Sequence, residues 1–198
     1  FKDEIVPVTI KGRKGDTVVD TDEGPREGTS MEVLGKLRPV VKPGGIVTAG
    51  NASSLNDGAS AIIIASERAI KEYGLTARAR IVDGASAGVP PEIMGIGPVP
   101  ATQKVLQRSG ISLDQVGAFE LNEAFATQSL ACIRRLGVDE AIVNNDGGAI
   151  ALGHPLGSSG SRIAITLLGR MEREGAPHGI ATMCVGVGQG TAMLIEAV

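Results

Sequence analysis

Residues 147–160 read GGAIALGHPLGSSG, and the rest of the chain is organised around this stretch. It holds five glycines, which let a backbone turn sharply and approach a ligand or another segment closely. His154 lies among them, directly before residues 161–174, whose apolar spacing predicts a helix. Backbone N–H donors at a helix start can hold a reacting group, so the stretch indicates either a functional loop or a close-packed turn.

Composition places the chain among globular proteins with an aliphatic core. It has 198 residues, 42% hydrophobic and 2% aromatic, with a net charge of −3. The basic residues are scattered, which argues against nucleic-acid binding, and no apolar run is long enough to span a membrane. The two cysteines form no metal-binding pair, so a reduced, cytoplasmic setting is expected. The first residue is Phe1 and no targeting segment is visible, so we expect a processed or truncated piece.

From residue 46 onward, the pattern alternates between strands and helices. Strands are predicted over residues 61–65, 80–85, 118–121, 141–144, 179–183 and 191–195, the last two as a hairpin. Helices are predicted over residues 67–73, 100–108, 122–136 and from about 158 to 174. This order predicts an α/β fold, a βαβαβαβαββ unit with a mixed, largely parallel sheet and helices on both faces. Residues 1–45 are loop-rich, with a short strand near residues 8–10 and a short helix near residues 29–37.

Three segments follow the carboxyl ends of predicted strands, where ligands bind in such sheets. They are NEAF at residues 122–125, the loop that carries His154, and CVGVGQG at residues 184–190. A histidine can take a proton from a thiol near neutral pH, and a cysteine beside glycines can be exposed for chemistry. Asn122 can be read as the N-cap of the following helix or as an amide that holds a water. A Cys-His-Asn hydrolase and carbon–carbon bond chemistry at a carbonyl are both open at this point.

Taken together, these motifs resemble the thiolase family, the acetyl-CoA C-acyltransferases. A fourth segment, GNASSLNDGA at residues 50–59, also resembles a pattern of that family. The resemblance implies a thiolase-like layered fold, of which the chain covers only the C-terminal half. It divides the chain into residues 1–45, the remainder of a loop region, and residues 46–198, the C-terminal domain, with the N-terminal domain absent.

The resemblance implies a catalytic role for four residues. His154 would activate a nucleophilic cysteine and help to polarise the thioester oxygen, and Asn122 would hold a water at the same oxyanion site. Cys184 would move a proton on and off the acetyl α-carbon. The backbone amide of Gly186 would serve a second oxyanion hole.

The resemblance also implies how substrates are held. Ser53 would contact the pantetheine arm of CoA, Met94 and Phe125 would line the acyl pocket, and Arg26 is a weaker candidate for the CoA nucleotide. CoA and acyl-CoA are then substrates, and neither a cofactor nor a metal is expected. The expected partners are the missing N-terminal half and further copies of the enzyme, in a homodimer or homotetramer.

Two departures from the family pattern shape the functional prediction. Ser54 stands where the family usually has glycine, and the nucleophilic cysteine has no counterpart, because Cys132 lies in a predicted helix where it would pack. The parent enzyme would cleave 3-oxoacyl-CoA or condense acetyl-CoA, with fatty acid β-oxidation as one setting. The isolated chain is predicted to be inactive and to expose an apolar face. The alternative is a non-catalytic thiolase-like protein that binds acyl-CoA or lipid.

Overall fold

Four strands form the central sheet of the computed structural model, which describes residues 1–198. They are β3 (Ala79–Gly88), β4 (Ala118–Leu121), β5 (His178–Val185) and β6 (Gln189–Ala197), in the spatial order β3-β6-β5-β4. β4 and β5 pair in parallel, whereas β6 pairs antiparallel with both β5 and β3. The sheet is therefore mixed, as predicted, but it is not largely parallel, because the return strand β6 makes two of its three strand pairs antiparallel. Three strands run in one direction, and the hairpin return strand β6 lies between two of them.

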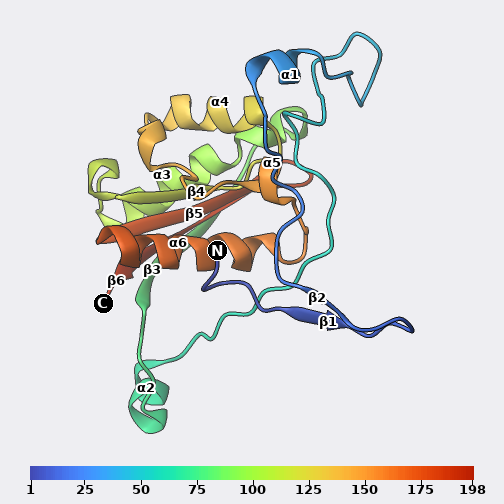
Figure 1. The fold of residues 1–198 in the computed structure, drawn as a ribbon. Helices are drawn as coiled ribbons and strands as arrows, with labels where there is room; N and C mark the ends of the chain where they lie inside the picture. The colour runs from blue at the N-terminus through green and yellow to red at the C-terminus, as the bar shows by residue number, and fades with distance from the viewer.

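Helices cover both faces of this sheet, also as predicted. α3 (Pro98–Ser109) and α4 (Ala126–Leu136) lie on one face, and α6 (Ser159–Glu174) lies on the other (Figure 1). The alternation of side chains along β4 serves both layers, since Phe119 packs with the α3 and α4 core. Ala118 instead packs with Leu167 of α6. Polar residues at the end of β4 are therefore held between two packed layers.

The remaining elements are short. They are β1 (Val8–Ile10), β2 (Thr17–Val19), α1 (Met31–Gly35), α2 (Glu67–Tyr73), α5 (Ala149–Leu152) and the 3₁₀ helices Pro91–Ile96, Leu113–Gln115 and Glu140–Ile142. α2 begins at the Ser66 cap and ends at the left-handed Gly74, as its sequence predicts. Figure 1 shows that α2 and the β1–β2 hairpin stand away from the sheet. None of the helices is both long and apolar enough to cross a bilayer.

Three local predictions are wrong. Residues 61–65 form no strand, and Ile63 is 86% exposed, because this apolar run has no neighbouring strand to pair with. Residues 141–144 form a 3₁₀ turn and a single bridge between Val143 and Phe119. The chain leaves the extended conformation at Asn144, whose φ is 48°. The helix predicted from residue 122 begins only at Ala126.

Candidate active site

Asn122 extends β4 by one residue and points its side chain toward the His154 loop. Its backbone N–H donates to the carbonyl oxygen of Thr182 on β5 at 3.0 Å. Its side-chain Nδ2 lies 3.5 Å from His154 Nε2, and the residue is 1% exposed. The N-cap interpretation of Asn122 is wrong, because Phe125 is the residue that precedes α4. The amide is therefore available to the site instead of the helix.

The imidazole of His154 is oriented by Ser159 in the first turn of α6. Nδ1 lies 2.6 Å from Ser159 Oγ, and this hydroxyl donates to the carbonyl oxygen of Pro155 at 3.1 Å. Because that bond uses the hydroxyl hydrogen, Ser159 accepts from Nδ1–H, and the lone pair of Nε2 faces Asn122. Ser159 is a site residue that the sequence reasoning missed. Its only signal is a serine five positions after the histidine, at the start of the helix.

The protonation of His154 suits a base. Burial lowers the pKa of the imidazole, and the nearby Arg162 guanidinium lowers it further. His154 is therefore neutral at neutral pH, with one ring nitrogen able to accept a proton.

A buried carboxyl group and a partly buried guanidinium lie behind this pair of residues. Glu120, two residues before Asn122 on the same face of β4, has a carboxylate oxygen 3.8 Å from Nη1 of Arg162. Burial raises the pKa of Glu120 to about 8, and the attraction of Arg162 opposes that rise. The sequence reasoning did not single out either residue, because a charged residue inside a short strand carries no local functional signal.

Residues 51–55 join the two loops through backbone hydrogen bonds. The Ser53 N–H donates to the carbonyl oxygen of Ala124 at 3.1 Å, and the His154 N–H donates to the carbonyl oxygen of Ser54 at 3.0 Å. The Ser53 hydroxyl also donates to Ala124, at 3.4 Å. The predicted pantetheine residue is thus placed beside both NEAF and the His154 loop.

Cys184 and Gly186 lie at the same end of the sheet, on the β5–β6 hairpin. Cys184 lies two residues after Thr182, whose carbonyl oxygen accepts the Asn122 N–H. Cys184 is buried, so desolvation raises the pKa of its thiol. Gly186 lies in the hairpin turn, followed by Val187 and Gly188 with φ of 60° and 88°. The structure brings Asn122 and His154 into contact, whereas the hydrogen bonds of that pair do not include Cys184.

The remaining predicted substrate residues surround this end of the sheet. Met94 lies in the 3₁₀ helix Pro91–Ile96, half-buried, and this helix packs near the start of β6. Phe125 is exposed and bridges to Ala52. Arg26 lies on an exposed segment, two residues from Gly24, whose backbone abuts Ala151 of α5. Its guanidinium makes no ion pair.

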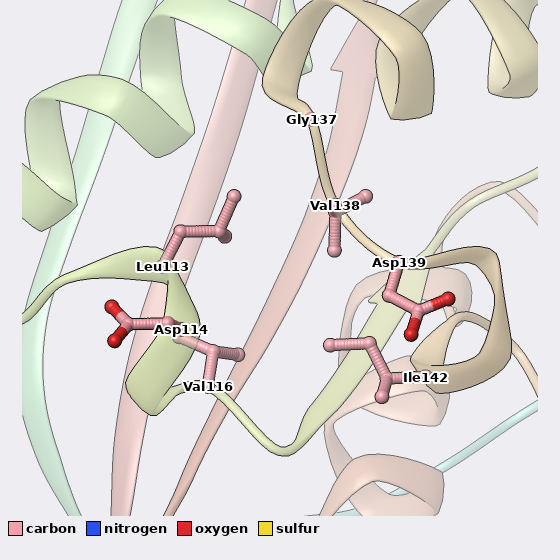
Figure 2. Close-up of a pocket in the computed structure, with 7 residues that line it drawn as sticks. All are labelled: Leu113, Asp114, Val116, Gly137, Val138, Asp139 and Ile142. Carbon is pink, nitrogen blue, oxygen red and sulfur yellow. The ribbon is translucent and has the colours of Figure 1, made fainter.

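A cavity lies away from this site. It has a volume of about 530 Å³ and lies between α4 and the 3₁₀ helices Leu113–Gln115 and Glu140–Ile142. Figure 2 shows four aliphatic side chains around it, with the two carboxylates on opposite sides. Its lining residues are Leu113, Asp114, Val116, Gly137, Val138, Asp139 and Ile142. Val116 precedes β4, so the cavity lies at the amino end of that strand, opposite Asn122.

Family models of the two thiolase domains match the chain. The thiolase C-terminal domain matches residues 59–197, and the thiolase N-terminal domain matches residues 1–68. The unpaired apolar run at residues 61–65 lies inside both matches. This division differs in its bounds from the predicted domains, which stay a prediction.

Individual relatives agree with the family models. A beta-ketoadipyl-CoA thiolase from Pseudomonas aeruginosa is 58% identical over the whole chain, which covers 50% of that protein. The acetyl-CoA acetyltransferase of Bacillus anthracis has a similar structure, with a TM-score of 0.95 at 47% identity over 99% of this chain and 50% of its own. Human mitochondrial 3-ketoacyl-CoA thiolase in complex with CoA gives a TM-score of 0.90 at 48% identity, over 96% of this chain and 48% of its own. The chain spans about half the length of the curated relatives that it matches, and it belongs to the thiolase family.

Proposed function

We propose that the chain supplies the carboxyl-terminal half of an active site that transfers acyl groups between CoA thioesters. The reaction is the thiolytic cleavage of 3-oxoacyl-CoA or, in reverse, the Claisen condensation of acetyl-CoA. The observation that carries the proposal is the part-buried Asn122–His154 pair, with 3.5 Å between the amide and imidazole nitrogens. Family membership and the related structure with CoA support CoA thioesters as the substrate class.

In the cleavage direction, His154 acts as the base. Its neutral imidazole accepts the proton of an attacking thiol at Nε2, and the thiolate adds to the 3-oxo carbon. Asn122 holds a water that, with His154, stabilises the thioester oxygen, where negative charge develops as the carbon–carbon bond breaks. Two observations support these roles, the lowered pKa of His154 and the hydrogen bond at Nδ1 that leaves Nε2 as the unprotonated ring nitrogen. Transition-state charge is then met by donors that are already in place.

Cys184 completes the proton balance. Breaking the carbon–carbon bond leaves an electron pair on the α-carbon of acetyl-CoA, and the Cys184 thiol donates a proton to that carbon. Burial raises the pKa of this thiol, which keeps it protonated and supports a donor role. The Gly186 amide serves the second oxyanion hole, at the oxygen of the 3-oxo carbon that the thiolate attacks. The thiol of CoA then attacks the acyl group on the nucleophile, its proton restores the Cys184 thiol, and His154 returns its proton to the nucleophile that leaves. In the condensation direction, Cys184 removes the α-proton when the carbon–carbon bond is formed.

CoA is held by the residues around this end of the sheet. Ser53 contacts the pantetheine arm, Met94 and Phe125 line the acyl pocket, and Arg26 meets the nucleotide. The name of the Pseudomonas aeruginosa relative supports a 3-oxoacyl substrate. The enzyme needs no cofactor beyond its substrates, functions in the cytoplasm within fatty acid metabolism or β-oxidation, and forms a homodimer or homotetramer.

The 198 residues by themselves do not transfer acyl groups in this proposal, because neither cysteine is the acyl-accepting nucleophile. Cys132 is fully buried in α4, its thiol donates to the carbonyl oxygen of Gly95 at 3.3 Å, and burial raises its pKa to about 11. The nucleophile comes from an N-terminal thiolase half. Exposed apolar side chains at Leu55, Ile63 and Leu156 support such a partner.

The test is reconstitution in trans. The purified chain is assayed for CoA-dependent cleavage of acetoacetyl-CoA, alone and with the separately produced N-terminal half of the Pseudomonas aeruginosa relative. We expect no turnover alone and turnover in the mixture. We expect none when the chain carries His154→Ala, although size-exclusion chromatography still detects the complex. Turnover by the chain alone contradicts its inactivity, and a complex that binds acyl-CoA without turnover establishes the non-catalytic alternative.

A further inference from the structure

The Asn122–His154 pair is flanked by a second set of polar side chains that sequence analysis did not select. Asn144 follows the bridge to Phe119, and its side-chain amide lies along the outer edge of β4. Its Oδ1 accepts from the Leu121 N–H at 2.8 Å, and its Nδ2 donates to the Leu121 carbonyl oxygen at 2.7 Å. These are the two bonds that a neighbouring strand would make with Leu121. A single side chain thus ends the sheet one residue before Asn122.

Glu123 extends this arrangement on the other side of Asn122. Its Oε1 accepts the second hydrogen of Asn144 Nδ2 at 3.1 Å, and its Oε2 accepts the backbone N–H of Ile150 in α5 at 3.1 Å. The Asn144 amide is therefore fully satisfied, with one bond accepted and two donated. The two residues that flank Asn122 in sequence are both tied to Asn144, and the second of them is also tied to α5.

The backbone between these groups is shaped to allow the contact. Asn144 has a φ of 48°, in the left-handed region that asparagine tolerates better than most residues. A Cβ at Gly148 would overlap the carboxylate of Glu123, so the carboxylate can occupy this place only beside a glycine. α5 then leads directly through Gly153 to His154. The conformation of the loop is thus built around the carboxylate of Glu123.

We infer that Asn144 and Glu123 form a polar clamp that positions Asn122 and His154 relative to each other. The inference rests on the proposed function for its relevance to acyl transfer. The clamp residues touch neither reacting atom, so they are positioning residues. They connect the end of β4, which carries Asn122, to the first turn of α5, which precedes His154. Loss of the clamp frees the His154 loop while the two packed cores stay intact.

NMR titration of the His154 imidazole tests the clamp on the full 198-residue chain. The chain has two histidines, so the His154 signal is assigned with His178→Gln. Asn144→Gly removes the amide but keeps the left-handed backbone free of strain. Burial is the main cause that lowers the pKa of His154, so a loosened loop admits water and shifts the midpoint upward, toward that of free histidine. Glu123→Gln, which keeps one acceptor oxygen, is expected to shift it upward by less.

The matched control is Asn145→Gly, at the exposed neighbour whose amide donates to the Ala141 carbonyl oxygen. This variant is expected to leave the His154 midpoint unchanged. An unchanged midpoint in a folded Asn144→Gly chain overturns the inference, and so does an equal shift in the control. If Asn144→Gly fails to fold, Glu123→Gln becomes the test. An unchanged or lowered His154 midpoint in Glu123→Gln then overturns the inference. The imidazole is observed directly, so a failure of acyl transfer leaves this result unaffected.

Discussion

Residues 1–78 contain none of the 40 buried residues of the chain, whereas residues 79–198 contain all of them. Both regions have apolar residues in strand-like and helical patterns, so composition does not separate them. The two regions differ in whether an apolar segment has a second strand or helix to pack against. Strands β3 to β6 pair with one another and pack against helices, while residues 61–65 have the same apolar character without a partner. Local sequence thus sets a preference, and burial requires a second surface.

A matched pair of truncations tests this contrast most directly. Leu167→Ala removes a fully buried side chain between α6 and the sheet, and about 2–5 kcal/mol of unfolding free energy is expected to be lost. Ile63→Ala removes an exposed side chain and is expected to cost less than about 0.5 kcal/mol. Urea denaturation measures both. Equal losses would show that residues 61–65 are packed in solution.

A pH series tests the cost of polar residues inside the packed region. The pKa of Glu120 is about 8 in the folded chain and near 4.5 when unfolded. Between these values, the folded state holds a proton that the unfolded state releases. The stabilisation is therefore complete below the unfolded pKa and is lost as pH rises through the folded pKa.

Unfolding free energy is then expected to fall by roughly 2–4 kcal/mol from pH 5 to pH 8.5. Glu120→Gln is expected to flatten that decline, and Glu140→Gln, at an exposed position, is expected to leave it in place. Denaturation at a series of pH values measures all three chains. A decline of the same size in Glu120→Gln would assign it to another group.

Ser60 forms a side-chain contact between residues 1–78 and residues 79–198, and its substitution tests what that contact contributes. Its hydroxyl lies 2.7 Å from Ser158 Oγ and donates to the Ser158 carbonyl oxygen at 3.1 Å. Ser60→Ala is expected to cost about 1 kcal/mol. It is also expected to speed cleavage of residues 56–65 in limited proteolysis. Thr21→Val, which removes an exposed hydroxyl, serves as the control, and equal cleavage rates in both variants would dissociate Ser60 from this role.

Val187 offers the smallest expected effect, and it lies in the packed region. A β-branched residue with a φ of 60° is strained by about 1–2 kcal/mol, and Val187→Gly relieves this. The added freedom of glycine in the unfolded chain offsets about 0.4–1 kcal/mol. We expect a net gain below about 1 kcal/mol in thermal unfolding. Val185→Gly, in a regular strand, is expected to destabilise, and a similar loss at Val187 would contradict the strain argument.

Local signals predicted the elements whose determinants are adjacent in sequence. β4 was predicted with its observed bounds, and α2 with both of its caps, because strand alternation and capping residues act over a few positions. The strand at residues 61–65 was wrong, since strand formation depends on a partner that the segment itself does not specify. Asn122 has the chemistry of a helix cap, and only the observed start of α4 excludes that role.

The site was predicted in part for a related reason. The rule that ligand-binding loops follow strand ends placed Asn122 correctly at the end of β4, and Asn122 contacts His154 as expected. The strand expected before the His154 loop is instead a 3₁₀ turn with a single bridge at Val143. Ser159 and Asn144 were not predicted, because each acts through hydrogen bonds to residues that only the fold brings near. Such contacts leave no repeating pattern in the sequence. The roles of Cys184, Gly186 and the CoA-binding residues stay predictions.

The backbone hydrogen bonds of residues 51–55 affect how recombination between related genes would change the site. The segment belongs to the region without buried residues, yet it holds NEAF on one side and the His154 loop on the other. The two loops are therefore aligned from both parts of the chain, by the polar clamp within residues 79–198 and by this segment within residues 1–78. Recombination between related sequences within residues 66–78 would exchange the aligning segment whole and leave every strand of the sheet with its original partners. Such a crossover would change the relative placement of Asn122 and His154 and leave the sheet unchanged.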